Sequence, residues 1–235
     1  MNLNKHIKDF LIGTLLGDAH IGRTGFNKAF ISFEQSSKKI EYLNYLLLRN
    51  ITKEGGIPAL AMEDGIKEYV REDSRYKTKN KSLYFRTQSL ESLKPMAELF
   101  LDTEGKKTIP TNISDHLTAR SLAFWIMDDG QQVKKGGLTL CTDSYNSNEI
   151  HILREALKQN FKLDTTIHNK KGRNDAIYEI IYIKKDEFEN VKPSLIQHMH
   201  SSMLYKINEN TIKQDSSDIE NDGTDIMDIF DIGGS

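Results

Sequence analysis

The sequence has 235 residues, of which 37% are hydrophobic and 28% are charged, and it contains a single cysteine, Cys141. This composition is typical of a globular protein with a hydrophobic core. One cysteine excludes an intramolecular disulfide and a cysteine zinc site. No apolar run approaches the roughly 18 residues of a membrane span, so we expect no membrane partner.

The charge is distributed unevenly along the chain. Of the 32 basic and 34 acidic residues, one lysine and eight acidic residues fall in the segment 209–235, which leaves 31 basic and 26 acidic residues in 1–208. The segment 209–235 is rich in Asp, Ser and Gly and has no apolar period, so we expect an acidic disordered tail. This tail is either an inert extension or a competitor of a polyanion for the basic body.

Two apolar segments of helical length stand at matching places in the two halves of the chain. Residues 7–17 and 118–128 each run directly into an aspartate, Asp18 or Asp129, that is followed by a small residue. A segment with this apolar content and length predicts a buried helix. The two segments therefore predict an internal repeat.

The segments that follow these helices show the same order of expected strands and helices in both halves, which supports the repeat. Strands are expected at 29–36, 57–62, 66–71 and 82–87 in the first half and at 137–144, 164–169 and 176–183 in the second. Middle helices are expected at 38–50 and 147–161, and late helices begin near Leu90 and Lys185. The pattern predicts an α+β fold with a pseudo-two-fold pair of αββαββα repeats, each with an antiparallel sheet. The expected division is a first repeat at 1–107, a linker at 108–117, a second repeat at 118–208 and the tail at 209–235.

The two aspartates stand at an electrostatically unfavourable place. A carboxylate at the C-terminus of a helix faces the negative end of the helix dipole, which costs about 0.3–1 kcal/mol. If the two helices pack side by side, Asp18 and Asp129 also repel each other unless a cation lies between them. Hard oxygen ligands indicate Mg²⁺ or Mn²⁺ rather than zinc. A solvated helix end would explain one such aspartate, but not two at matched positions.

The motifs resemble those of a known family. LIGTLLGDA (11–19) and LAFWIMDDG (122–130) are similar to the two signature helices of LAGLIDADG homing endonucleases of the single-chain, two-repeat type. KKTIPTNI (106–113) and MLYKI (203–207) look most like the branch that includes the yeast mitochondrial omega-intron endonuclease. The resemblance covers nearly all of residues 7–208.

The resemblance implies a site-specific endonuclease of a mobile intron that hydrolyses both strands of double-stranded DNA at a long recognition site. It implies that Asp18 and Asp129 are catalytic and bind the metal. It also implies one catalytic lysine in each half, Lys107 (with Lys106 as the alternative) and Lys206. The implied metal is Mg²⁺, with Mn²⁺ expected to substitute for it and Ca²⁺ expected to support binding without cleavage.

The expected partner is double-stranded DNA, with host intron RNA as a further one, and the expected state is a monomer that acts as a pseudo-dimer. The resemblance favours the organelle where the gene is encoded, a mitochondrion or chloroplast, with a bacterial or phage cytoplasm as the alternative. Phe124 and Asp128 depart from the motif, because the family has small residues there. We therefore expect a looser or an asymmetric crossing of the two helices.

The DNA contacts are expected on strands and their loops, because a twisted antiparallel ribbon fits the major groove. The candidate residues are Arg71, Arg75, Lys77, Lys79, Lys81, Arg86, Lys170, Lys171 and Arg173. A solvated hairpin without a partner would have the same composition. Which of these residues read bases and which hold phosphates stays open at this point.

Two other functions remain compatible with the sequence. An RNA maturase that assists splicing of its host intron would have the same fold, and so would a non-catalytic DNA-binding regulator. Retention of both aspartates favours cleavage over either alternative. The histidines at 151, 168, 198 and 200 show no spacing typical of a zinc or HNH nuclease site.

Overall fold

A computed structural model of the protein describes residues 3–53, 57, 65–73, 78–134, 136–172 and 175–207. The tail expected at 209–235 lies outside these residues, as do Arg75, Lys77 and Arg173. In the described part, no helix is both long enough and apolar enough to cross a membrane.

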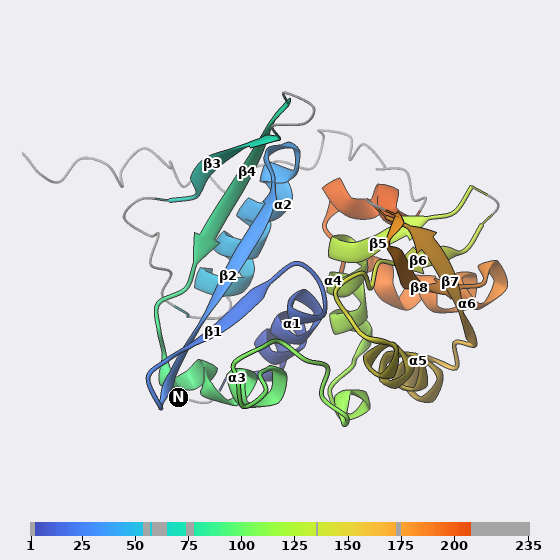
Figure 1. Cartoon of the computed structure of the whole chain (residues 1–235), viewed down its shortest axis with the longest axis horizontal. Helices are drawn as coiled ribbons and strands as arrows, with labels where there is room; N and C mark the ends of the chain where they lie inside the picture. Colours follow the sequence, from blue (N-terminus) through green and yellow to red (C-terminus); the bar gives the residue numbers. More distant parts are fainter. Residues whose placement is uncertain are drawn as a thin grey trace, which may run out of the picture.

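Two helices that pack against each other occupy the centre of the molecule (Figure 1). They are α1 (Lys5–Leu16) and α4 (Ala119–Asp129). A polar side chain begins each helix: Asn4 accepts a hydrogen bond from the amide of Ile7, and Thr118 forms a capping box with Ser121. Most side chains of both helices are buried, which explains why both segments are apolar. The two helices expected from the motifs are confirmed.

A four-stranded antiparallel sheet lies on each side of this helix pair (Figure 1). The first sheet, in the order β1-β2-β4-β3, is formed by β1 (His20–Thr24), β2 (Lys28–Ser36), β3 (Lys67–Asp73) and β4 (Thr78–Arg86). The second, in the order β5-β6-β8-β7, is formed by β5 (Gly130–Gln132), β6 (Leu138–Leu140), β7 (Thr165–Lys171) and β8 (Ile177–Ile183). The matching strand order confirms the α+β fold of two αββαββα repeats.

The remaining helices cover one face of each sheet. In the first half they are α2 (Ile40–Asn44), which continues as a π-helix (Tyr45–Lys53), and α3 (Lys94–Phe100). In the second half they are α5 (Ser147–Phe161) and α6 (Lys185–Ile196), followed by a 3₁₀ helix (Ser201–Ile207). We propose that residues 108–117, between α3 and α4, link the two repeats.

The first strand of each sheet was not expected from the sequence. The strand β1 (His20–Thr24) contains Gly22, which favours a turn interpretation. The glycine leaves room for the ring of Phe30 on the neighbouring strand, because a Cβ at Gly22 would lie 2.5 Å from the Cζ atom of that ring. Of the strand expected at 57–62, only Ile57 is described, and it is not in a strand.

The helices α1 and α4 cross closely, so the expectation of a looser crossing is wrong and that of an asymmetric one is right. A Cβ at Gly13 would lie 2.3 Å from the carbonyl oxygen of Ser121 and 2.7 Å from the Cβ of Phe124. The small residues of α1 therefore receive the larger side chains of α4. The ring of Phe10 meets that of Phe124 edge-on, with 4.9 Å between centroids, and joins the cores of the two halves.

Candidate active site and nucleic-acid interface

The close crossing brings the two motif aspartates to the same end of the helix pair. The backbone amide of Asp18 donates a hydrogen bond to the carboxylate of Asp128, the residue before Asp129, at 3.3 Å. Asp18 is exposed and Asp129 is half-buried. The three carboxyl groups of Asp18, Asp128 and Asp129 therefore form one acidic cluster.

Two carboxyl groups of this cluster have raised pKa values. Burial, together with the negative charge of Asp18, raises the pKa of Asp129 to about 7. Burial and the charges of Asp18 and Asp129 also hold the pKa of Asp128 well above its usual range. The positive charges of Lys39, Lys107 and Lys206 lower the pKa of Asp129 only in part. Burial thus outweighs the attraction of the surrounding lysines and favours the protonated form of both carboxyl groups.

The two predicted lysines hold equivalent places beside these aspartates. The Nζ atom of Lys107 donates to the carbonyl oxygens of Gly17 and Ala19, the neighbours of Asp18, each at 3.2 Å. The Nζ atom of Lys206 donates to the carbonyl oxygens of Asp128 and Gly130, the neighbours of Asp129, at 3.0 and 2.8 Å. The geometry therefore selects Lys107 over its exposed neighbour Lys106.

These lysines also satisfy the C-terminal carbonyl groups of the two motif helices. Each ammonium group lies at the negative end of a helix dipole, where a cation is stabilising. Lys107 makes a third hydrogen bond, to the carbonyl oxygen of Leu15 at 3.0 Å, so all three of its N–H groups are used. Lys206 makes two such bonds to the described residues and has one N–H left for a ligand. The two halves of the site therefore differ, because Lys206 has an N–H group that can reach substrate and Lys107 has none.

Two side chains of the first half, Gln35 and Tyr42, donate hydrogen bonds to the acids of the cluster. The Nε2 atom of Gln35 donates to Asp18 Oδ2 at 2.8 Å and to Asp128 Oδ1 at 3.1 Å. The hydroxyl group of Tyr42 donates to Asp128 Oδ1 at 3.0 Å. Neither Gln35 nor Tyr42 was a candidate from the sequence. Tertiary structure alone brings them to the acids from β2 and α2.

Two further side chains near the cluster were also missed. The half-buried Lys39 lies close enough to the acids to lower the pKa values of both Asp128 and Asp129. The hydroxyl group of Tyr145 donates to the carbonyl oxygen of Leu16 in the other half at 2.8 Å. Burial raises the pKa of Tyr145, and the charge of Asp129 raises it further. No motif marks either residue in the sequence.

The open face of the first sheet carries part of the expected DNA interface. Because strand side chains alternate between faces, Arg71 and Arg86 share the face opposite the core. The guanidinium carbon of Arg86 lies 3.3 Å from the ring centroid of Phe30, and its buried Nε atom has no hydrogen-bond partner among the described residues. The guanidinium carbon of Arg71 lies 5.2 Å from the ring centroid of Tyr69.

The alternation of strand side chains also places the other candidate DNA-binding residues on one face of a sheet or the other. Lys81 lies on the opposite face of the first sheet and forms an ion pair with Glu68 at 2.9 Å. In the second sheet, Lys170 shares the open face with Tyr178 and forms an ion pair with Asp143 at 3.1 Å, whereas Lys171 follows on the other face. Lys79 belongs to β4, and its side chain lies outside the described residues.

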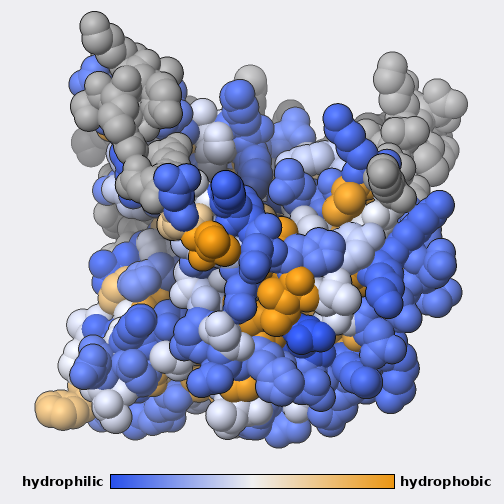
Figure 2. Space-filling view, turned by 45° about the vertical axis from the view of Figure 1, so that its right-hand side comes forward, coloured by the Kyte–Doolittle hydropathy of each residue, from blue (hydrophilic) through white to orange (hydrophobic). Residues whose placement is uncertain are grey.

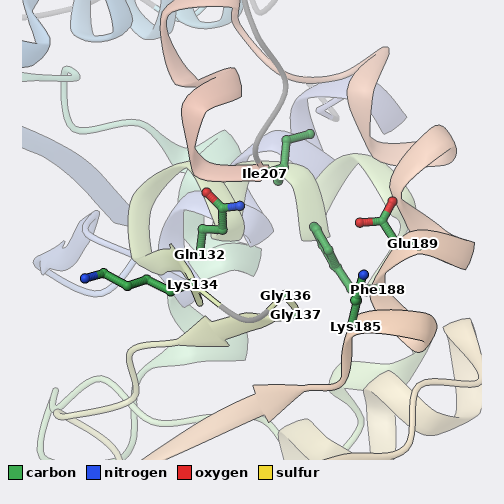
Figure 3. A pocket seen from close by; sticks show the side chains of 8 residues that line it. All are labelled: Gln132, Lys134, Gly136, Gly137, Lys185, Phe188, Glu189 and Ile207. Carbon is green, nitrogen blue, oxygen red and sulfur yellow. The ribbon is translucent and has the colours of Figure 1, made fainter.

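A separate pocket lies at the end of the second sheet. It has a volume of about 250 Å³, and Figure 3 shows Lys134, Lys185 and Phe188 among the side chains that line it. None of the four predicted catalytic side chains lines this pocket. The face of the molecule in Figure 2 is mostly hydrophilic, and its apolar side chains lie in small separate areas. The acidic cluster is thus the candidate site for chemistry.

The cluster fits a hard divalent cation in charge and in donor type. Asp18 and Asp129 offer carboxylate oxygens, and burial and the charge of Asp18, which raise the pKa of Asp129, are both offset by a bound cation. Within the described ranges, no three Asp, Glu, His or Cys side chains form a complete metal cage. A cation at this site would therefore take its other ligands from water or phosphate, as Mg²⁺ commonly does.

The protein is similar in sequence to DNA endonucleases and to mRNA maturases. The chain is 26% identical over 226 residues to the DNA endonuclease I-ChuI of Chlamydomonas applanata, covering 89% of this chain and 97% of that protein. It is 29% identical over 212 residues to the cytochrome b mRNA maturase bI2 of Saccharomyces cerevisiae. That match covers 87% of this chain but 48% of the maturase, so the chain spans about half the length of that relative.

A solved structure agrees with the sequence relatives. The homing endonuclease I-WcaI bound to its DNA recognition sequence is 25% identical to this chain, with a TM-score of 0.72 and coverage of 89% of both chains. The family described as LAGLIDADG DNA endonuclease matches residues 8–191, which include both motif helices. The chain belongs to the LAGLIDADG DNA endonuclease family.

Proposed function

We propose that the protein is a site-specific endonuclease that cleaves both strands of double-stranded DNA by metal-dependent hydrolysis. One observation carries this proposal: each motif helix has an aspartate at or just beyond its C-terminus, and the carbonyl groups beside that aspartate accept hydrogen bonds from a lysine of the same half. The two constellations are equivalent and converge on one acidic cluster. Because the site contains two aspartate–lysine pairs side by side, each pair can act on one phosphodiester, one on each DNA strand.

The proposed chemistry assigns a role to each side chain. Divalent cations shared by Asp18 and Asp129 would supply an activated water and a Lewis acid for the leaving oxygen on each strand. The ammonium group of Lys206 has an N–H with which to stabilise charge on a phosphate or to orient water. The ammonium group of Lys107 acts as a fixed positive charge, because its N–H groups are held by carbonyl oxygens. Lys39 adds a further positive charge beside the acids.

The open faces of the two sheets are the proposed DNA-contact surface. Arg71 and Arg86 on the first sheet and Lys170 on the second lie on these faces. The half-buried Arg86 is stacked on the ring of Phe30, so its guanidinium group adds a positive charge to the open face. Arg75, Lys77, Lys79, Lys171 and Arg173 stay predictions from the sequence. Lys81 is left out of this surface because it pairs with Glu68 on the other face.

The remaining expectations complete the proposal. We expect Mg²⁺ to be the working ion, Mn²⁺ to substitute for it and Ca²⁺ to support binding without cleavage. We also expect a monomer, because the repeat supplies both half-sites in one chain. Expression from a mitochondrial or chloroplast intron stays a prediction.

The test is a cleavage assay on a DNA library. The protein is incubated with randomised duplexes, or with intron-insertion sites, in the presence and absence of Mg²⁺, and the new ends are sequenced. We expect Mg²⁺-dependent ends that define one long site. The matched control is the double variant Asp18→Asn with Asp129→Asn, which should yield no ends. Ends of random sequence, or none from the wild type, would contradict the proposal.

A second candidate function is RNA maturation. The relative in S. cerevisiae is named a cytochrome b mRNA maturase, and the match covers most of this chain. A splicing assay with the host intron, run in parallel with the cleavage assay, separates the two functions. Splicing that persists in the double aspartate variant while DNA cleavage is lost would show both activities in one chain. Splicing without any DNA cleavage by the wild type would assign the maturase function instead.

A further inference from the structure

Gln35 makes the contact that most directly fixes a candidate metal ligand. Its side-chain amide donates one hydrogen bond to Asp18 Oδ2 and one to Asp128 Oδ1, so both N–H groups are used. Gln35 is only 5% exposed, whereas Asp18 is exposed. An exposed aspartate samples several rotamers, and this bond restricts Asp18 to one of them. The other oxygen of Asp18 accepts no hydrogen bond from the described residues.

The buried partner of Gln35 is itself fixed. Asp128 is 6% exposed, and besides Gln35 it accepts hydrogen bonds from the Tyr42 hydroxyl group and from the Asp18 amide. Tyr42 is fully buried. Asp128 therefore serves as an anchor in the interface between the two halves, and Gln35 connects this anchor to Asp18. Buried polar networks of this kind hold their members in one arrangement when every member is satisfied.

The second half has no counterpart of this connection. His20 pairs with Ser32 in the first sheet, and its equivalent Gln131 pairs with Thr139 in the second. Three residues further along the chain, Gln35 therefore corresponds to Thr142, which lies two residues beyond the end of β6. The hydroxyl group of Thr142 donates to the carbonyl oxygen of Glu179 rather than to an acid.

The carboxylate of Asp129 accordingly accepts no hydrogen bond from any side chain in the described ranges. The anchor is also one-sided, because the counterpart of Asp128 in the first motif is Gly17. The two candidate metal ligands are thus held differently.

We propose that Gln35 is a positioning residue that sets the orientation of Asp18 for metal binding, with Asp128 and Tyr42 as its support. The inference rests on the proposed function, since it assumes that Asp18 binds the ion. It makes the first half-site preorganised and leaves the second to be ordered by the ion itself. Removal of an outer partner of a metal ligand commonly lowers metal affinity or activity by about 10–100-fold. Because the support is one-sided, the loss should differ between the two DNA strands.

The test compares three variants of the full chain. Gln35→Met keeps the length of the side chain and removes both hydrogen bonds, and Tyr42→Phe removes only the bond to Asp128. Thr142→Val is the matched control, because it removes a buried hydroxyl group at the equivalent position of the repeat without touching an acid. Gln35→Asn replaces Gln35→Met if the latter fails to fold.

Two readouts separate positioning from a merely structural role. The first is the rate of nicking of each end-labelled strand as a function of Mn²⁺ concentration. The second is Mn²⁺ binding to the full chain without DNA, measured from the signal of the free ion by electron paramagnetic resonance. The second readout does not depend on turnover, so it distinguishes a failure of this inference from a failure of the proposed function.

For Gln35→Met we expect the Mn²⁺ concentration for half-maximal nicking to rise about tenfold for one strand and much less for the other. The rate at saturating Mn²⁺ should change less, and Mn²⁺ binding should weaken at one site. Tyr42→Phe should show the same strand preference with a smaller shift, and Thr142→Val should show none. Equal slowing of both strands, or unchanged Mn²⁺ binding by Gln35→Met, would overturn the inference. If the wild type binds Mn²⁺ but cuts neither strand, the proposed function fails while the binding result still decides the role of Gln35.

Discussion

Gly17 and Asp128 lie so close that a Cβ on Gly17 would be 2.5 Å from the Cβ of Asp128 and 2.6 Å from its Oδ2 atom. The space beside Asp128 therefore favours glycine at this position. The larger motif residue of α4 therefore occupies the space that the glycine of α1 leaves. This fit places Asp128 against Asp18 and Gln35.

The first prediction concerns this fit. Gly17→Ala should lower the free energy of unfolding by about 1–3 kcal/mol, because the new methyl group displaces Asp128 or separates the helices. A double-mutant cycle with Asp128→Gly checks the cause by urea denaturation. Much of the penalty of Gly17→Ala should vanish when residue 128 lacks a Cβ. Additive losses in the cycle would show that the two residues do not compete for space.

The second prediction concerns pH in the metal-free protein. The pKa of Asp129 is about 7 in the fold, against 3.8 for an ordinary aspartate. Between these values the unfolded chain has released a proton that the folded chain retains, so stability falls as the pH rises from 3.8 to about 7. Asp129→Asn should flatten this slope, and Ca²⁺ should reduce it in the wild type. Urea denaturation at several pH values in chelator checks this, and stability that rises with pH over this range would contradict it.

The third prediction separates the two lysines. Lys107→Met removes three hydrogen bonds to carbonyl groups and Lys206→Met removes two. We expect Lys107→Met to lower the free energy of unfolding by about 2–4 kcal/mol and Lys206→Met by less. Lys206→Met should in turn slow cleavage by about 100-fold, and more on one strand, because its free N–H can reach substrate. Urea denaturation and a strand-resolved nicking assay measure both effects. Equal effects of the two substitutions in both assays would refute the distinction.

The fourth prediction concerns the DNA-contact surface. Arg86→Ala should weaken DNA binding and reduce the slope of log affinity against log salt by about one, as the loss of one phosphate contact does. Lys81→Ala is the matched control in the same strand, because Lys81 lies on the other face with Glu68. It should change neither affinity nor slope. Salt-titrated binding curves in Ca²⁺ decide the matter, and equal losses for both variants would place DNA on both faces.

The features that could be predicted from the sequence are those that depend on local pattern and on the internal repeat. The motif helices, Asp18 and Asp129 could be found because apolar periodicity and a matched aspartate recur in each half. Lys107 and Lys206 followed from the family resemblance, and the structure places both beside these acids.

The contacts between distant elements could not be predicted. Gln35 and Tyr42 reach the acids only through tertiary packing, since no motif marks a residue that faces a cluster on another element. Strand β1 was missed because Gly22 is typical of a turn, whereas here it makes room for Phe30. Lys81 was grouped with Arg86 by proximity in sequence, although five residues along a strand reverse the face.

We propose above that Asp18 and Asp129 form one metal-dependent active site that cleaves DNA. It is tested most directly by a nicking assay of Asp18→Asn and Asp129→Asn on an end-labelled duplex of the identified site, beside a binding curve in Ca²⁺. We expect each substitution to abolish cleavage of both strands. Binding should be nearly unchanged, because the loss of a negative charge near phosphates does not weaken the electrostatic part of affinity. Full cleavage of both strands by Asp18→Asn would contradict the account.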